Sequence, residues 1–135
     1  MSEPAEREEV IPFLHVDDLE RSLRFYVDGL GFEVRDRWEV EGRLRWCRLE
    51  RRGVSLMLQS RAPGASGPGG SGISIVIFCH DARARYRELR GRGLAPSLPF
   101  VGNGLWVTTL VDPDGYRVDI ESPADAPEDT VHDEP

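Results

Sequence analysis

Four side chains in this sequence could carry out acid–base chemistry or bind a divalent metal ion. Asp119 and Glu121 lie two residues apart in a predicted strand, so they share one face and could act as an acid and a base. His15 and His80 each stand near the end of a predicted strand, and with the two carboxylates they form a conceivable metal-ligand set. Both histidines also flank helix starts, where capping or solvent-facing roles are commoner. The residues alone therefore leave the metal site open.

Covalent catalysis has few candidates in this chain. All 17 basic residues are arginine, and the absence of lysine excludes Schiff-base chemistry and a Walker phosphate loop. The glycine-rich stretch 64–72 lacks the Gly-Lys-Ser/Thr ending of such a loop and is interpreted as a linker. Cys47 lies among arginines, but no signature pairs it with a histidine, so we expect Cys47 and Cys79 to be buried free thiols.

Charge and hydropathy narrow the possible partners. The formal net charge of −7 argues against non-specific nucleic-acid binding and for cationic or neutral ligands. Arginines cluster at 43–52 and 83–92, but acidic residues interleave with or flank both clusters, which favours solvated faces. No apolar run reaches the length of a membrane span, and residues 1–9 are acidic where a signal peptide would be basic. We expect a cytoplasmic protein with no membrane partner.

Two segments of the chain repeat the same strand-to-helix pattern. In each, an apolar strand runs into an aspartate that can cap a helix, and apolar or small residues follow at spacings of four, three and four. Each member of the second set lies 63 residues after its counterpart in the first: Leu19, Leu23, Tyr26 and Leu30, then Ala82, Tyr86, Leu89 and Gly93. The chain is therefore interpreted as a tandem duplication whose halves pack together, because one half is too short to close a core.

The predicted order of elements is β-α-β-β-β, twice, which makes the fold class α+β. In the first half we expect strands at 10–16, 32–40, 43–51 and 54–59 and a helix at 18–29. In the second half we expect strands at 73–79, 105–111 and 116–121, one ending near 100–101, and a helix at 81–92. A single domain spans 10–122, made of module one (10–60), a linker (61–72) and module two (73–122). The acidic tails 1–9 and 123–135 are expected to be disordered, which leaves His132 without a role.

The sequence resembles the vicinal oxygen chelate superfamily, which includes glyoxalase I, bleomycin-resistance proteins and extradiol dioxygenases. Two motifs carry the resemblance: Val16-Asp17-Asp18-Leu19-Glu20-Arg21-Ser22 with Phe25-Tyr26 and Leu30-Gly31-Phe32, and Asp112-Pro113-Asp114-Gly115-Tyr116-Arg117-Val118-Asp119-Ile120-Glu121. The resemblance implies two βαβββ modules with helices outside a curved sheet that encloses a cleft. It does not fix the function, because the superfamily holds both metalloenzymes and metal-free binding proteins.

In the enzymes of this superfamily, the resemblance implies a divalent metal held by the first and last strands of each module. The matching positions here fall on Ile11, Ser74, Asp119 and Leu56, the last uncertain by one residue either way. Of these only Asp119 offers a carboxylate, and one ligand of four does not hold a metal. We therefore expect no cofactor, with the divalent metal set of His15, His80, Asp119 and Glu121 as the alternative.

The remaining cleft would be apolar with few polar contacts, which is typical of a small-molecule site. We expect it to be lined by Ile11, Phe13, His15, Leu56, Ser74, Val76, Phe78 and Asp119, with Trp38, Trp46 and Trp106 as candidate stacking platforms. Tryptophans on strands more often pack in a core than against a ligand. The leading hypothesis is a metal-free protein of the bleomycin-resistance type that binds a planar hydrophobic molecule, neutral or cationic. The alternative is a glyoxalase-type lyase or dioxygenase. The resemblance also implies a homodimer, in which a second chain completes the cleft.

Overall fold

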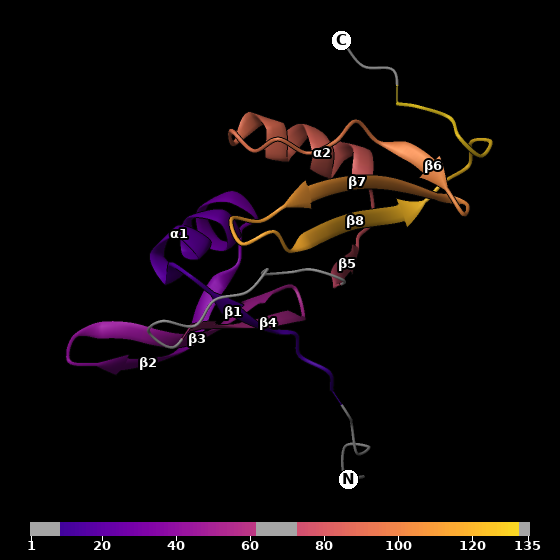
Figure 1. Cartoon of the computed structure of the whole chain (residues 1–135). Coiled ribbons are helices and arrows are strands. Elements are labelled where there is room, and N and C mark those ends of the chain that lie inside the picture. Colours follow the sequence, from indigo (N-terminus) through magenta and orange to yellow (C-terminus); the bar gives the residue numbers. More distant parts are fainter. Residues whose placement is uncertain (1–8, 62–72, 133–135) are drawn as a thin grey trace, which may run out of the picture.

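The structure is a computed structural model, and it describes residues 9–61 and 73–132. These residues form two four-stranded sheets, each with a helical segment on one of its faces (Figure 1). The strand orders are β1-β4-β3-β2 and β5-β8-β7-β6, so the two sheets repeat one topology. The predicted α+β fold of two βαβββ modules is confirmed. The predictions for residues 1–8 and for the linker at 62–72 lie outside the described residues.

The first module begins with β1 (Phe13–Val16) and a helical segment made of α1 (Leu19–Leu23) and the π-helical turn η1 (Arg24–Gly29). Asp18 caps α1 by accepting the backbone N–H of Arg21 at 3.2 Å. Three strands follow, each antiparallel to the next: β2 (Glu33–Val40), β3 (Arg43–Arg51) and β4 (Val54–Ser60).

The second module repeats this order with β5 (Ser74–Phe78), α2 (Ala82–Gly91), β6 (Phe100–Gly102), β7 (Leu105–Val111) and β8 (Arg117–Pro123). Asp81 caps α2 by accepting the N–H groups of Arg83 and Ala84, both at 3.1 Å. Strand β6 is the shortest because Pro96 and Pro99 occupy the segment before it and cannot donate to a ladder.

In both sheets the first strand pairs with the last strand in parallel, and all other pairs are antiparallel. The parallel pairs are β1 with β4 and β5 with β8. Strands β1 and β5 therefore stand at sheet edges, where no other described strand pairs with their outer side. On the outer side of β1 the His15 carbonyl accepts the Tyr116 hydroxyl at 3.3 Å.

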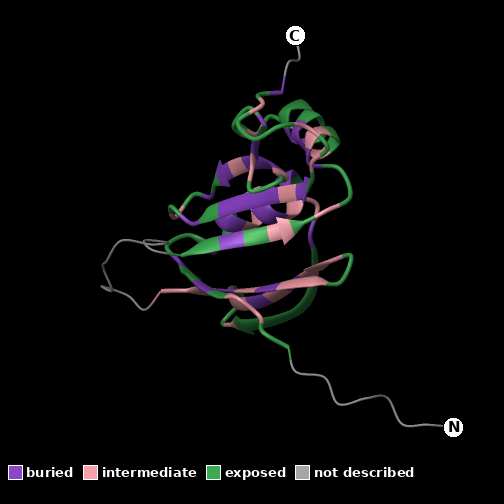
Figure 2. Ribbon diagram, turned by 90° about the vertical axis from the view of Figure 1, so that its right-hand side faces the viewer, coloured by how far each residue is buried: buried purple, intermediate pink, exposed green. Residues whose placement is uncertain are grey.

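Alternate residues of each strand separate a core face from an open face. Figure 2 shows the burial alternating along the strands. On the first sheet the core face carries Leu14, Val16, Cys47, Leu49, Leu56 and Leu58, all at most 2% exposed. On the second it carries Ile75, Trp106, Thr108, Leu110, Val118 and Ile120. The helices pack on these core faces, since α1 contacts β4, and α2 contacts β7 and β8. No helix of the described residues lies over the opposite faces (Figure 1).

The turn between β7 and β8 joins the two modules. Asp112 accepts the hydroxyl of Tyr26 at 2.7 Å and the backbone N–H groups of Asp114 and Tyr116, both at 2.8 Å. Asp114 reaches the start of α1, where it accepts the Asp17 N–H at 2.9 Å and the Ser22 hydroxyl at 3.3 Å. This turn belongs to the second motif of the sequence, and it fixes the first helix in place.

The C-terminal segment differs from the expectation that residues 123–135 are disordered. Residues 124–132 return along β6, where the N–H of Val101 donates to Thr130 at 2.8 Å and the N–H of His132 donates to Pro99 at 2.8 Å. His132 is only 8% exposed, and its ring lies edge-on against Trp106 and Tyr86. Polar composition did not reveal that residues 124–132 pair with an open strand edge, and residues 133–135 lie outside the described residues.

Candidate functional site

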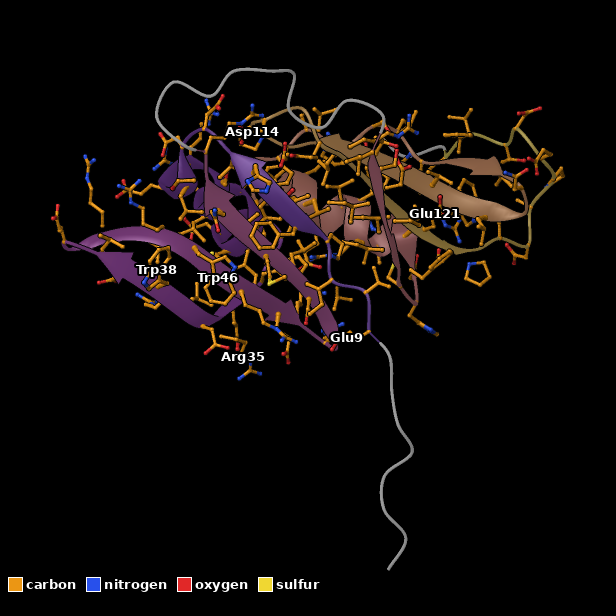
Figure 3. The ribbon with its side chains drawn as sticks, turned by 60° about the horizontal axis from the view of Figure 1, so that its bottom comes forward. Glu9, Arg35, Trp38, Trp46, Asp114 and Glu121 are labelled. Carbon is orange, nitrogen blue, oxygen red and sulfur yellow. The ribbon has the colours of Figure 1, made fainter. Side chains whose placement is uncertain are left out.

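The open face of the first sheet carries a continuous row of side chains across all four strands. His15 of β1 is paired with Gln59 of β4, Gln59 with Trp46 of β3, and Trp46 with Trp38 of β2. Partners in a ladder point to the same side of a sheet, so these four side chains are neighbours on one face. Figure 3 shows Trp38 and Trp46 side by side on this sheet. The row combines two indole rings with an amide and an imidazole, and we call it the tryptophan row.

A second row runs beside the first on the same face. Phe13 is paired with Met57, and Met57 with Arg48. The Phe13 ring lies 5.1 Å from the ring of His15, and its side chain is 41% exposed. Ile11, just before β1, is half-buried. The aromatic side chains thus lie on a face of mixed polarity, because Asp36 is paired with Arg48 and Glu50 with Ser55 on the same side. Trp38 is the most exposed of these aromatic side chains, at 57%.

The open face of the second sheet is built differently. Phe78 is paired with Glu121, and Val76 with Asp119. Ser74, at the start of the same strand, is paired with Arg117. Phe78 and Val76 are 67% and 44% exposed, which is unusual for apolar residues in the middle or at the end of a strand. Figure 3 shows Glu121 on this second sheet, away from the two tryptophans.

Asp119 is already held by its neighbours. One of its oxygens accepts the hydroxyl of Thr109 at 2.6 Å and the Arg117 Nε–H at 2.9 Å, and the other lies 3.1 Å from the same Nε. A carboxylate whose oxygens already accept these hydrogen bonds has few lone pairs left for a metal ion. Of the pair expected to act as acid and base, only Glu121 is without such partners among the described contacts.

Two residues expected in the cleft lie on the core faces instead. Leu56 is 1% exposed and packs with Leu58, while its neighbour Met57 occupies the open face. Trp106 is 4% exposed and lies under the guanidinium of Arg83, which is 4.7 Å from its ring centre. In a strand a shift of one residue moves a side chain to the other face, and the sequence did not fix that parity for β4 and β7.

The two thiols are not activated nucleophiles. Burial raises the pKa of Cys47 to about 11, and the side chain is inaccessible in the core. Burial also raises the pKa of Cys79, although its contacts with the Asp81 backbone and Arg85 oppose this. Both groups are thiols rather than thiolates at neutral pH, and both are free. Cys47 is buried as expected, whereas Cys79 is only half-buried.

The two open faces, the strand order and the motif-bearing turn are features that can be compared with known proteins. A family model described as Glyoxalase/Bleomycin resistance protein/Dioxygenase superfamily matches residues 11–120. The chain belongs to this superfamily. Among curated proteins, none matches it.

Solved structures of the superfamily fold resemble the chain over most of its length. A glyoxalase/bleomycin resistance protein/dioxygenase from Nocardioides has a TM-score of 0.70 at 21% identity, covering 93% of this chain and 89% of the other. TnmS3, an antibiotic binding protein from Streptomyces sp. CB03234, has a TM-score of 0.68 at 23% identity, covering 88% and 99%. TioX from Micromonospora sp. ML1 has a TM-score of 0.69 at 18% identity, covering 87% and 99%. At these identities the likeness shows the fold.

The metal positions implied by superfamily membership do not fit a metal in this chain. Ile11 has no donor atom, Ser74 is a poor ligand, and Met57, which takes the open-face place assigned to Leu56, offers only a thioether. Asp119 is bonded to Thr109 and Arg117. Across residues 9–61 and 73–132 no three His, Cys, Asp or Glu side chains come together as a metal site. The alternative set is also separated, because His80 borders a cavity with Leu30 and Arg51 whereas His15 lies in the tryptophan row.

Sequence reasoning missed one site altogether. A cavity at the junction of the modules is lined by Arg51, Arg52, Cys79, His80 and Arg85 together with apolar side chains. These residues come from both modules, and no local pattern brings them together.

No helix within the described ranges is long and apolar enough to span a bilayer.

Proposed function

We propose that this protein binds a planar, largely apolar small molecule on the open face of its first module. The observation that carries the proposal is the tryptophan row, His15–Gln59–Trp46–Trp38, which places two indoles beside hydrogen-bonding groups on a face that no helix covers. Stacking of an aromatic ligand on such a ring contributes about 0.5–1.5 kcal/mol beyond the burial of area. A positive charge on the ligand would add a cation–π term.

The charge of the chain favours a neutral or cationic ligand over an anionic one. Its net charge is −7, and Glu121 lies on the open face of the second module. Among the structural relatives, TnmS3 is an antibiotic binding protein. That function supports a binding role for this chain by likeness of fold, without identifying the ligand.

We further propose that a second copy of the chain completes the site. Each open face exposes apolar side chains, with Phe13 at 41% and Val76 at 44%, and each ends at an unpaired edge strand, β1 or β5. Contiguous exposed apolar surface next to open strand edges is typical of an interface. In a dimer, the first sheet of one copy would face the second sheet of its partner, so that the tryptophan row would meet Phe78 and Glu121.

Fluorescence titration tests the ligand proposal. The probes are 9-aminoacridine, which is protonated at neutral pH, and acridine, which is neutral. We expect both to bind, 9-aminoacridine more tightly, and we expect Trp46→Leu to weaken binding about two- to tenfold. Arg24→Gln, on an exposed part of η1, is the matched control and should bind like the wild type. Binding that survives both Trp46→Leu and Trp38→Leu unchanged would contradict the proposal.

Light scattering coupled to gel filtration tests the dimer. We expect a mass of about twice 15.2 kDa for the wild type. Phe13→Glu, on the open face of the first sheet, should shift the protein towards the monomer because it would bury a charge at the interface. Ala84→Glu places the same charge at an exposed position of α2, the helix that packs on the core face of the second sheet, and should remain dimeric. A monomeric wild type at micromolar concentration would refute this part.

A further inference from the structure

We propose that the cavity at the module junction is a second binding site, which takes a small organic anion with a compact apolar body, such as an aromatic carboxylate. The cavity has a volume of about 170 Å³. It lies between the β3–β4 turn of the first module and the end of β5 with the start of α2 in the second. It shares only Phe78 with the open faces, so this inference does not depend on the proposed function.

The walls of the cavity suit an apolar body of limited size. They are formed by Leu30, Phe32, Val54, Ile77, Phe78 and Ile120. A cavity of about 150 Å³ with comparable walls is large enough to hold benzene. The junction cavity therefore has room for one aromatic ring or a short branched chain, and an inorganic anion alone would leave these walls unfilled.

The polar side of the cavity is strongly cationic. Arg51, Arg52 and Arg85 line it, and Arg92 lies directly behind. Glu88 is the acidic partner in this group, and it is shared by Arg85 and Arg92, each at 3.0 Å. No ion pair is recorded for Arg51 or Arg52 within the described residues. Glu33 and Glu50 border a neighbouring hollow with Arg51 and Arg52. The described lining of the cavity itself holds three arginines and no carboxylate, which leaves a positive excess at its wall.

The backbone holds these like charges close together. Gly31 has a φ of +87°, and a Cβ at this position would lie 3.2 Å from Arg51 Nε and 3.3 Å from Arg92 Nη1. Both guanidinium groups therefore pack over the same glycine. Arg85 and Arg92 are fixed from the other side, since they donate to the backbone carbonyls of Leu30 and Gly29. Side chains held in this way cannot simply move apart to relieve their repulsion.

The electrostatic cost of this arrangement is visible at Arg51. Its pKa is lowered by burial and by the charges of Arg85, Arg52 and Arg92, against which Glu88 acts only in part. A bound carboxylate would supply the missing negative charge and could accept two hydrogen bonds from a guanidinium fork. Anion binding therefore follows from the same contacts that pack the junction.

Calorimetric titration with benzoate tests this site. We expect benzoate to bind, whereas benzyl alcohol, which has the ring without the charge, and inorganic phosphate, which has the charge without the ring, should bind at least tenfold more weakly. Arg51→Gln should weaken benzoate binding about tenfold, because a charged hydrogen bond is lost. Arg24→Gln is the matched control and should bind benzoate like the wild type.

Cys79 provides an independent readout, because it lines the cavity and is half-buried, whereas Cys47 is fully buried. Benzoate should slow the alkylation of Cys79 by iodoacetamide in the wild type, measured by mass spectrometry, and should do so less in Arg51→Gln. The buried Cys47 should stay unalkylated in both proteins, which would show that the variant is folded. Because Arg51 also lowers the pKa of Cys79, the rates with and without benzoate are compared within each protein. Trp46→Leu should keep benzoate binding even where 9-aminoacridine binding is lost, which separates the two sites. Equal benzoate binding by wild type and Arg51→Gln, or no protection of Cys79, would overturn the inference.

Discussion

The β3–β4 turn and the β7–β8 turn occupy equivalent places in the two modules, and each meets the helical segment of the other module. The β7–β8 turn presents Asp112 and Asp114, whose oxygens are filled by donors from Tyr26, Ser22 and the backbone. The β3–β4 turn presents Arg51 and Arg52, which face a cavity and further arginines. A duplicated scaffold has thus produced one saturated junction and one with unused charge and space.

This difference indicates how roles divide on a repeated fold. A junction whose polar groups are all paired contributes to stability, because removing any partner leaves a buried group unsatisfied. A junction with excess charge contributes little to stability on its own, but it is prepared for a ligand of opposite sign. The open faces also differ, since the first carries Trp38 and Trp46 and the second carries Phe78 and Val76 with Glu121.

The comparison of the two turns is tested most directly by removing a hydrogen-bond acceptor from the β7–β8 turn. Asp112→Ala leaves the Tyr26 hydroxyl and two backbone N–H groups without their acceptor. We expect the free energy of unfolding to fall by about 3 kcal/mol. Arg51→Gln, in the equivalent turn, should change it by less than about 0.5 kcal/mol. Urea unfolding of both variants decides this, and equal losses would mean that the cationic junction is structural too.

The pH dependence of stability should expose the same junction. Burial and the neighbouring Asp112 raise the pKa of Tyr26 far above its ordinary value, so the folded state favours the protonated phenol. A raised pKa contributes stability that is fully present below the ordinary value of about 10 and is lost as pH rises above it. We expect a loss of about 1.4 kcal/mol per pH unit in that alkaline range.

The matched variant for this pH effect is Tyr26→Phe. It removes the ionisable group and one hydrogen bond, so it should be less stable than the wild type at pH 7 but lose less stability between pH 10 and 11. Thermal melts at a series of pH values give the comparison. Parallel curves for the two proteins would assign the alkaline loss to other groups.

A smaller effect is expected from the C-terminal segment, which covers the second module and has no counterpart in the first. Ending the chain after Pro123 removes His132 from the ring of Trp106. We expect a loss of about 1–2 kcal/mol, from the apolar surface that becomes exposed. With Trp38 and Trp46 changed to Phe, acrylamide quenching should rise on truncation, because Trp106 is then the sole tryptophan. Ending the chain after His132 is the control and should leave quenching unchanged.

The sequence was sufficient for features that local physics controls. The capping residues Asp18 and Asp81, the bounds of β3 and β7 and the repeat of 63 residues all follow from short-range patterns. Prediction from the sequence was less reliable where a shift of one residue decides which face of the sheet a side chain occupies, as at Leu56 and Trp106.

Long-range contacts were beyond the reach of sequence patterns. The polar composition of residues 124–132 predicts disorder, yet the backbone of this segment pairs with β6. The cationic cavity joins Arg51 to Arg85 across the two modules. The arginine clusters were interpreted as solvated faces because each was judged by its neighbours in sequence, whereas the cavity depends on which residues the fold brings opposite them.

The smallest effect is expected from metal removal, and it sharpens the comparison of the open faces. Among the described residues neither face offers a metal-ligand set, and Asp119 is bonded to Thr109 and Arg117. Dialysis against EDTA should therefore change the melting temperature by less than about 1 °C, because a ligand that binds only the folded state would otherwise raise it measurably. Elemental analysis of protein purified without chelator completes the test. Stoichiometric zinc, nickel, manganese or iron that Asp119→Asn abolishes would show that the Arg117 contact opens to admit an ion, and the second face would then have to be regarded as a metal site.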